Sequence, residues 1–122
     1  MKNSYTFFAF ILFLAAGCTN PLREAVVGNW QAVKVTEERD TLPVNTEEIT
    51  LSLRPDAGYE YSGTLNYEEA GNWHLEGDLL ITADTLNDSA AKAVLILQAA
   101  RDTLILEMQE EGKKRILTMT RN

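Results

Sequence analysis

Apolar and polar residues alternate with a period of two over most of the chain after residue 28. In the stretch ITLSLR, residues 49–54, every apolar residue is followed by a polar one. Such alternation is typical of β-strands that bury one face, and turn-forming residues such as those of 55–58, PDAG, separate the stretches. The pattern predicts eight strands, over residues 30–35, 49–53, 59–65, 73–76, 79–83, 93–97, 103–108 and 115–120.

The connections between these strands are mostly two to five residues long, which favours antiparallel neighbours. An open meander would leave two unpaired edges, whereas closure into a barrel removes both of them. A two-sheet sandwich is the alternative, but its crossovers usually need longer connections than most of these. We therefore predict an all-β fold, an eight-stranded antiparallel up-and-down barrel preceded by a short helix that begins near Pro21.

Two connections are longer than the others, residues 37–47 and 84–91. In a meander barrel, all connections that follow odd-numbered strands lie at the same end. The predicted connection at 67–71 also follows an odd-numbered strand. The sequence therefore predicts that one end of the barrel carries the longer loops and is open.

The N-terminal segment has Lys2 followed by ten apolar residues, 7–16. A membrane-spanning helix needs about 20 such residues, so this run is too short, and a basic start before a short apolar stretch is typical of a secretory signal. We expect residues 1–17 to be a lipoprotein signal peptide and 18–27 to be a lipidated cysteine, a tether and the short helix. Residues 28–122 then form the barrel domain.

The only cysteine of the chain ends the segment Leu14-Ala15-Ala16-Gly17-Cys18. This segment resembles the lipobox of bacterial lipoproteins. The resemblance implies that Cys18 carries a diacylglycerol thioether and an acylated amine, which anchor the protein stably in a lipid bilayer. The alternative is an ordinary signal peptide that is cut near Ala16 and leaves a free thiol. Since no Asp follows Cys18, the pattern resembles lipoproteins of the outer membrane, and we expect the domain to face the periplasm.

Charge narrows the range of partners. Without residues 1–17 the chain has 10 basic and 18 acidic residues, a formal net charge of −8. Such a charge repels phosphate backbones and anionic headgroups. We therefore expect no nucleic-acid partner and no binding to anionic lipid through the surface of the domain.

Two copies of the triplet GNW occur, at 28–30 and 71–73. The first resembles the Gly-x-Trp start of lipocalin-like barrels. The second, in GNWHLEGDLLIT, resembles a strand pair of bacterial lipocalin-like domains, and the RPDAGYEYSG hairpin and the closing LTMTRN fit the same small domain over residues 22–122. The resemblance implies a β-barrel of the calycin type in which Trp30 packs at the closed end beneath Arg121.

Recognisable catalytic chemistry is not found in the sequence. His74 is expected on the outer face, since it alternates with Trp73, and the Glu pairs at 37–38, 47–48, 68–69 and 110–111 fall in or beside turns, where charge is normally solvated. There is no phosphate loop, nucleophile elbow or Cys/His metal spacing. We therefore predict no enzyme activity, no cofactor and no metal site.

Five residues are candidates either for plain core or for the lining of a ligand cavity, in which tyrosine hydroxyls would be the polar groups. They are Leu51, Leu53, Tyr59, Tyr61 and Trp73. Two functions stay open. One is a membrane-anchored lipoprotein, a monomer, that binds a small apolar ligand in the bacterial envelope. The other is a protein-interaction or envelope-maintenance module whose barrel is filled.

Overall fold

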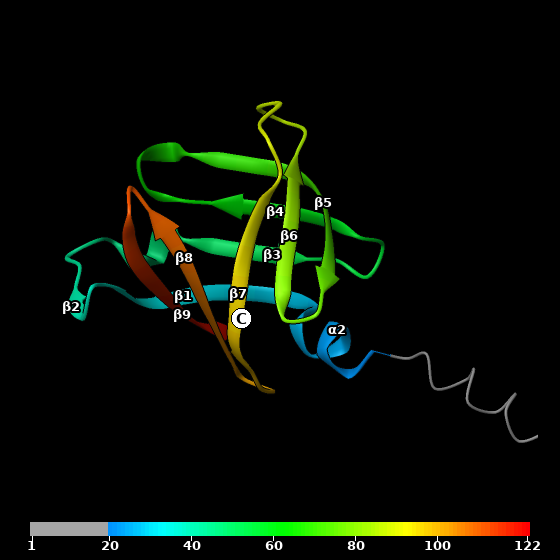
Figure 1. Cartoon of the computed structure of the whole chain (residues 1–122), viewed down its shortest axis with the longest axis horizontal. Helices are drawn as coiled ribbons and strands as arrows, with labels where there is room; N and C mark the ends of the chain where they lie inside the picture. Colours follow the sequence, from blue (N-terminus) through cyan, green and yellow to red (C-terminus); the bar gives the residue numbers. More distant parts are fainter. Residues whose placement is uncertain (1–19) are drawn as a thin grey trace, which may run out of the picture.

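In the computed structural model, residues 20–122 form one antiparallel sheet that closes on itself (Figure 1). The short helix α2 (Pro21–Val26) leads into β1 (Gly28–Glu37), which pairs with three other strands. The remaining elements follow in chain order: β2 (Asp40–Thr41), the 3-10 helix η1 (Thr46–Glu48), β3 (Thr50–Leu53), β4 (Gly58–Ser62), the 3-10 helix η2 (Thr64–Asn66), β5 (Glu68–Glu76), β6 (Leu79–Asp84), β7 (Lys92–Ala99), β8 (Thr103–Glu110) and β9 (Lys113–Arg121).

The last strand closes the barrel by pairing with the first. β1 and β9 run antiparallel from the pair Trp30–Arg121 to the pair Glu37–Arg115. A bulge at Val33 interrupts this register, and its extra residue increases the local twist that closure requires. The closed ring of eight antiparallel strands and the short helix before it confirm the predicted architecture and exclude the sandwich.

The structure corrects the strand predictions at three places. Residues 40–41 lie in a predicted loop but form β2, a two-residue strand on the edge of β1. The predicted strand 59–65 ends at Ser62, because the next turn places Leu65 at a φ of 59° with 92% of its surface exposed. β5 begins at Glu68, so most of the predicted connection 67–71 is strand.

Gly71 explains why the start of β5 does not have the sequence pattern of a strand. The sequence EEAGN at 68–72 is poor in strand-forming residues, yet Gly71 pairs with Asp84 in the ladder. A Cβ atom at Gly71 would lie 1.9 Å from the backbone oxygen of Ala83. The close approach of β6 therefore requires glycine here, and tertiary pairing overrides local propensity.

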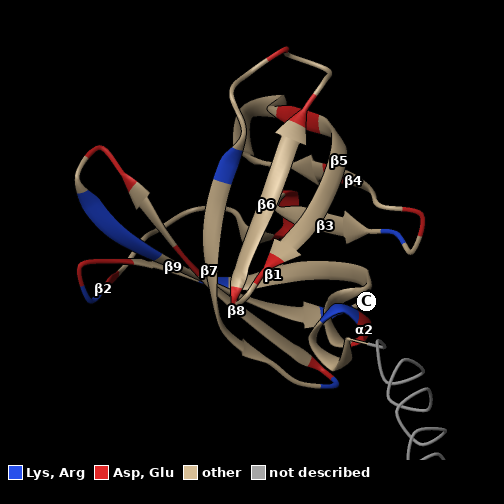
Figure 2. Cartoon of the chain, turned by 45° about the vertical axis from the view of Figure 1, so that its right-hand side comes forward, with Lys and Arg blue, Asp and Glu red and all other residues tan. Residues whose placement is uncertain are grey.

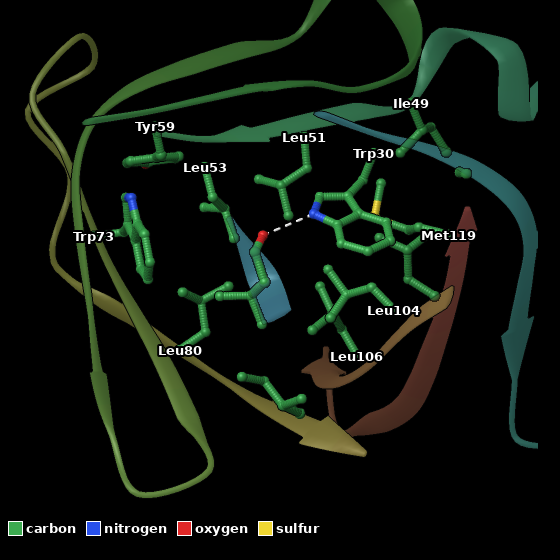
Figure 3. Packing of buried hydrophobic residues seen from close by; sticks show 14 of the residues in the cluster. Trp30, Ile49, Leu51, Leu53, Tyr59, Trp73, Leu80, Leu104, Leu106 and Met119 are labelled. Carbon is green, nitrogen blue, oxygen red and sulfur yellow. Dashed lines mark hydrogen bonds between the residues drawn. The ribbon is translucent and has the colours of Figure 1, made fainter. Parts of the chain in front are cut away.

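Large apolar side chains fill the interior of the barrel (Figure 3), including the end next to α2. The inward residues of successive strands supply them, as the period of two predicts. The largest fully buried side chains are Trp30, Trp73, Tyr59, Leu53, Leu80, Leu104, Met119 and Val26.

Helix α2 covers this filled end of the barrel. The side chain of Asn20 caps the helix by accepting from the backbone N–H groups of Leu22 and Arg23 at 3.0 and 3.4 Å. The indole N–H of Trp30 then donates to the carbonyl of Val26 at 2.8 Å. These contacts fix the helix against the barrel, and this end is called the closed end below.

We call the opposite end, which carries the longer connections, the open end. Four connections meet there, residues 38–49, 63–67, 85–91 and 111–112. Both connections that the sequence singled out as long belong to this set, as predicted from the strand count. Among residues 20–122, no helix has the length and apolar character needed to cross a membrane.

Candidate functional site at the open end of the barrel

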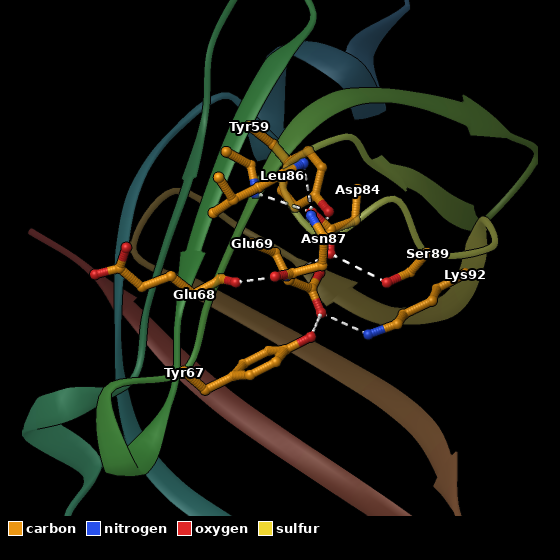
Figure 4. Close-up of polar contacts among 10 residues, drawn as sticks. Tyr59, Tyr67, Glu68, Glu69, Asp84, Leu86, Asn87, Ser89 and Lys92 are labelled. Atoms are coloured by element: carbon orange, nitrogen blue, oxygen red, sulfur yellow. Dashed lines mark hydrogen bonds and ion pairs between the residues drawn. The ribbon is translucent and has the colours of Figure 1, made fainter.

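A buried glutamate and three partners form a polar cluster just inside the open end (Figure 4). We call Tyr59, Tyr67, Glu69 and Lys92 the mouth cluster. The Tyr59 hydroxyl donates to one oxygen of Glu69 at 3.0 Å, and Tyr67 and Lys92 donate to the other oxygen at 2.5 Å each. The Glu69 carboxylate on β5 thereby links Tyr59 of β4, Tyr67 just before β5 and Lys92 of β7.

Glu69 is only 6% exposed, which overturns the expectation that the pair at 68–69 is solvated. Glu69 lies four residues before the buried Trp73 on β5, so both side chains point into the barrel, while that of Glu68 points outward. Burial raises the pKa of Glu69, but hydrogen bonds from Lys92, Tyr67 and Tyr59 outweigh this and lower it below its ordinary value. The carboxylate is therefore ionised inside the barrel.

The partners of Glu69 respond to its charge. Burial raises the pKa of Tyr59 and the hydrogen bond to Glu69 adds to this, while for Tyr67 the hydrogen bond to Glu69 is the main cause of a raised pKa. Burial lowers the pKa of Lys92, but its ion pair with Glu69 raises it more. Both tyrosines are thus held neutral and Lys92 charged.

Lys92 leaves part of its donor capacity free. Its side chain is 50% exposed, and an ammonium group has three N–H donors. Among residues 20–122 its hydrogen bond to Glu69 is the one formed by its Nζ atom. The mouth therefore presents N–H donors to any oxygen-bearing molecule that enters it.

A second ion pair lies on the other side of the open end. The Arg115 guanidinium donates to Glu37 at 2.7 Å across the β1–β9 ladder. The Nε atom of Arg115 is buried, and it has no hydrogen-bond acceptor among the described residues. Buried donors are nearly always paired in proteins, so this N–H group is an exception, and its burial keeps it out of reach of a molecule in the mouth. The basic residues of the open end come from the first residues of β7 and β9 and from Arg39 in the turn between β1 and β2 (Figure 2).

Between these polar groups and the filled core lies apolar surface that is only partly covered. Tyr61, Val94 and Met108 pack against the core but remain partly exposed, and Leu42 does so from the connection after β2. Tyr61, Val94 and Met108 each point inward. Each lies two residues from a buried residue of the same strand, on the side of the open end. The mouth thus combines an apolar wall with charged groups at its edge.

An open groove of about 230 Å³ adjoins the mouth between η1 and η2. Tyr67 belongs to both, since its ring borders the groove and its hydroxyl contacts Glu69. The groove is lined by Glu48, Ser62, Gly63, Asn66, Tyr67 and Glu68.

Asp84 shapes the neighbouring loop rather than the mouth. It is 3% exposed and accepts hydrogen bonds from the backbone of Leu86 and from Asn87 and Ser89. Burial raises its pKa, but the hydrogen bonds from Asn87 and from the backbone lower it more. An ionised Asp84 therefore organises the β6–β7 connection, one of the two long connections at the open end.

The residues proposed from the sequence as a cavity lining lie at different depths. Leu51, Leu53, Tyr59 and Trp73 are at most 5% exposed and form the packed core, whereas Tyr61 faces the mouth. The interior near the closed end is thus occupied by side chains.

The remaining predicted residues are placed as follows. Arg121 lies over the ring of Trp30 at the closed end, and His74 is exposed on the outer face with its ring nitrogen 2.9 Å from Glu76. Cys18 lies outside the described residues. Residues 20–122 contain no group of three or more His, Cys, Asp or Glu side chains that could hold a metal ion.

Sequence reasoning missed Glu69, Lys92 and Arg115. Glu69 lies four residues before Trp73, so the alternation of the strand could have indicated that its side chain points inward. The residues around it, EEAG at 68–71, instead predict a turn. Lys92 lies 23 residues further along the chain, and no local pattern joins the two.

Comparisons of the chain with protein-family models, with curated proteins and with solved structures found no match. The family resemblance stated from the sequence therefore remains a prediction.

Proposed function

We propose that the protein is an envelope lipoprotein, anchored through Cys18, whose barrel binds a small amphipathic molecule at its open mouth. The observation that carries the binding proposal is the buried, ionised Glu69 with Lys92 and two tyrosines inside the open end. Burying an ion pair costs desolvation free energy, and well-packed apolar residues would stabilise a barrel as well or better. Perturbed titratable groups in a concave site are a common mark of binding sites.

The chemistry of the mouth defines the ligand class. The exposed N–H groups of Lys92 favour a head group with acceptor oxygens. The partly exposed surface of Tyr61, Val94 and Met108 favours an apolar portion of modest size. Since side chains fill the closed half of the barrel, the ligand binds across the mouth and leaves the core packed.

Three probes of equal chain length test this class: laurate, dodecanol and dodecylamine. Calorimetric titrations at a salt concentration that screens the net charge of the domain isolate the local contacts. We expect laurate and dodecanol to bind and dodecylamine to bind more weakly, because an ammonium head has no acceptor for the free N–H donors of Lys92.

Replacing Lys92 by Met keeps the length of the side chain and removes its charged donors. We expect laurate affinity to fall about tenfold or more, since a hydrogen bond to a charged group contributes about 1.5–3 kcal/mol. The matched control is Lys34→Met on the exposed outer face of β1. Failure of all three probes to bind, or a preference for dodecylamine, would contradict the proposal.

A second function, recognition of a partner protein, is favoured by the apolar side chains on the rim. Val44, Leu65 and Leu86 lie on three separate connections of the open end and are 37%, 92% and 59% exposed. Crosslinking from Leu65→Cys in intact cells, with Leu97→Cys on the outer face as the control, separates this role from small-molecule binding.

A further inference from the structure

The position of helix α2 bears on how the barrel stands on a membrane. The helix is bound to the closed end by hydrogen bonds from both the first and the last strand. Trp30 donates to the carbonyl of Val26 at 2.8 Å, and Arg121 donates to those of Val27 and Ala25 at 2.9 and 3.1 Å. Arg23 extends these contacts to the β3–β4 turn by donating to the carbonyl of Pro55 at 3.0 Å. The start of the described chain is thus fixed to the closed end.

Covalent geometry limits the distance between this end and the lipid anchor. Cys18 is two residues before Asn20, so their Cα atoms are separated by at most about 7 Å. The longer strands of this barrel, β1, β5, β7, β8 and β9, have eight to ten residues. At a tilt of about 40° such strands make a barrel roughly 20 Å high. The tether is therefore much shorter than the distance from the closed end to the mouth.

We propose that the closed end stands against the bilayer and that the mouth opens away from it, toward the aqueous phase. This inference rests on the proposed acylation of Cys18. A tether of two residues excludes the inverted orientation, in which the anchor would have to pass along the whole side of the barrel. The turns of the closed end carry exposed charged residues, including Asp56, Asp78, Arg101 and Asp102, which are compatible with the headgroup layer but not with the hydrocarbon.

The orientation has two consequences for binding. The apolar rim residues Val44, Leu65 and Leu86 point away from the anchoring membrane, so their exposure serves a soluble ligand or partner rather than insertion into that bilayer. The ligand of the mouth cluster likewise enters from the aqueous phase and does not move sideways out of the anchoring membrane.

The single cysteine of the chain makes the orientation measurable. Once Cys18 is acylated no thiol remains, so an introduced cysteine is the only site for a thiol-reactive fluorophore. The acylated variants Leu65→Cys, at the rim, and Asp102→Cys, at the closed end, are reconstituted in phosphatidylcholine vesicles that contain a nitroxide-labelled lipid. We expect the fluorophore at position 102 to be quenched several-fold more strongly than the fluorophore at position 65.

A lengthened tether is the control. A Gly/Ser linker of about 20 residues inserted between Thr19 and Asn20 has a root-mean-square reach of roughly 25 Å, and the difference in quenching should then largely disappear. Equal quenching at both positions with the natural tether, or stronger quenching at position 65, would overturn the orientation. Failure of the protein to float with the vesicles would instead overturn the lipid anchor, and the orientation with it.

Discussion

The guanidinium of Arg121 lies over the indole of Trp30, with 4.2 Å between its central carbon and the ring centroid. The same group donates to the carbonyls of Arg101, Val27 and Ala25 at 2.8, 2.9 and 3.1 Å. One side chain at the end of the last strand thus joins the first strand, the helix and the β7–β8 turn. Gly28 allows this arrangement, since a Cβ atom there would lie 2.1 Å from an Arg121 nitrogen.

Replacing Arg121 by Met should therefore loosen the closed end. We expect the free energy of unfolding to fall by about 2–3 kcal/mol, because a cation–π contact and three charge-assisted hydrogen bonds are lost together. Urea denaturation followed by tryptophan fluorescence measures the change. Arg101→Met is the control, since that side chain is exposed, and it should change stability by less than about 0.5 kcal/mol. Equal effects of the two substitutions would show that the Arg121 contacts do not support the fold.

Gly71→Ala tests the close approach of β5 and β6. The added Cβ would overlap the backbone oxygen of Ala83, so one strand must shift, and we expect a loss of about 2–4 kcal/mol. Gly77→Ala is the comparison, because its added Cβ has open space and only its φ of 63° is unfavourable. It should cost about 1 kcal/mol. A smaller loss at Gly71 than at Gly77, measured by thermal unfolding, would contradict the packing described here.

The barrel itself could be predicted from the sequence because it follows from alternation and from short connections. Edge strands are unstable when exposed, so eight consecutive antiparallel strands lead to closure. The start of β5 could not be predicted, since Gly71 is in a strand only because β6 approaches it closely. The exposed Leu65 was likewise expected in a strand because its spacing from Tyr61 fits the alternation.

The mouth cluster was less predictable than the fold. Adjacent glutamates beside a turn are usually solvated. Tyr59, Glu69 and Lys92 come together only through the successive pairing of β4 with β5, β5 with β6 and β6 with β7. Such contacts depend on register, and a shift by one residue reverses the direction of every side chain.

The stability of the protein should depend on pH through Glu69. Its pKa in the folded state is lowered below the ordinary value of 4.5. The stabilisation by its ionised form is therefore fully present above pH 4.5 and is lost as the pH falls through the folded-state pKa. We expect Glu69→Gln to lower the free energy of unfolding by about 1–2 kcal/mol at neutral pH, after allowing for the half-exposed Lys92.

The difference in the free energy of unfolding between the wild type and Glu69→Gln should become smaller as the solution is acidified below pH 4.5. Urea midpoints measured at a series of pH values test it, with Glu107→Gln on the outer face of β8 as the control. A difference that stays constant down to strongly acidic pH would mean that Glu69 does not stabilise the fold through its charge.

Leu65→Gly separates stability from recognition at the rim. Leu65 has a left-handed backbone conformation, with φ 59°, and its side chain is almost fully exposed. Glycine adopts this conformation without strain, so the variant should be more stable by up to about 1 kcal/mol. A rise in the melting temperature together with weaker crosslinking to a partner would indicate that the leucine is kept for binding. A loss of stability would mean that Leu65 contributes to folding.

The most direct test of the binding mouth is to map the site by NMR. Laurate is titrated into ¹⁵N-labelled protein, and the amide shifts of all assigned residues are followed. We predict the largest changes at Tyr61, Glu69 and Val94, with little change at Trp30 and Val26 in the closed end. Changes confined to the outer face of β6 and β7, or no saturable change at any residue, would contradict the proposal that the open end of this barrel is a binding site.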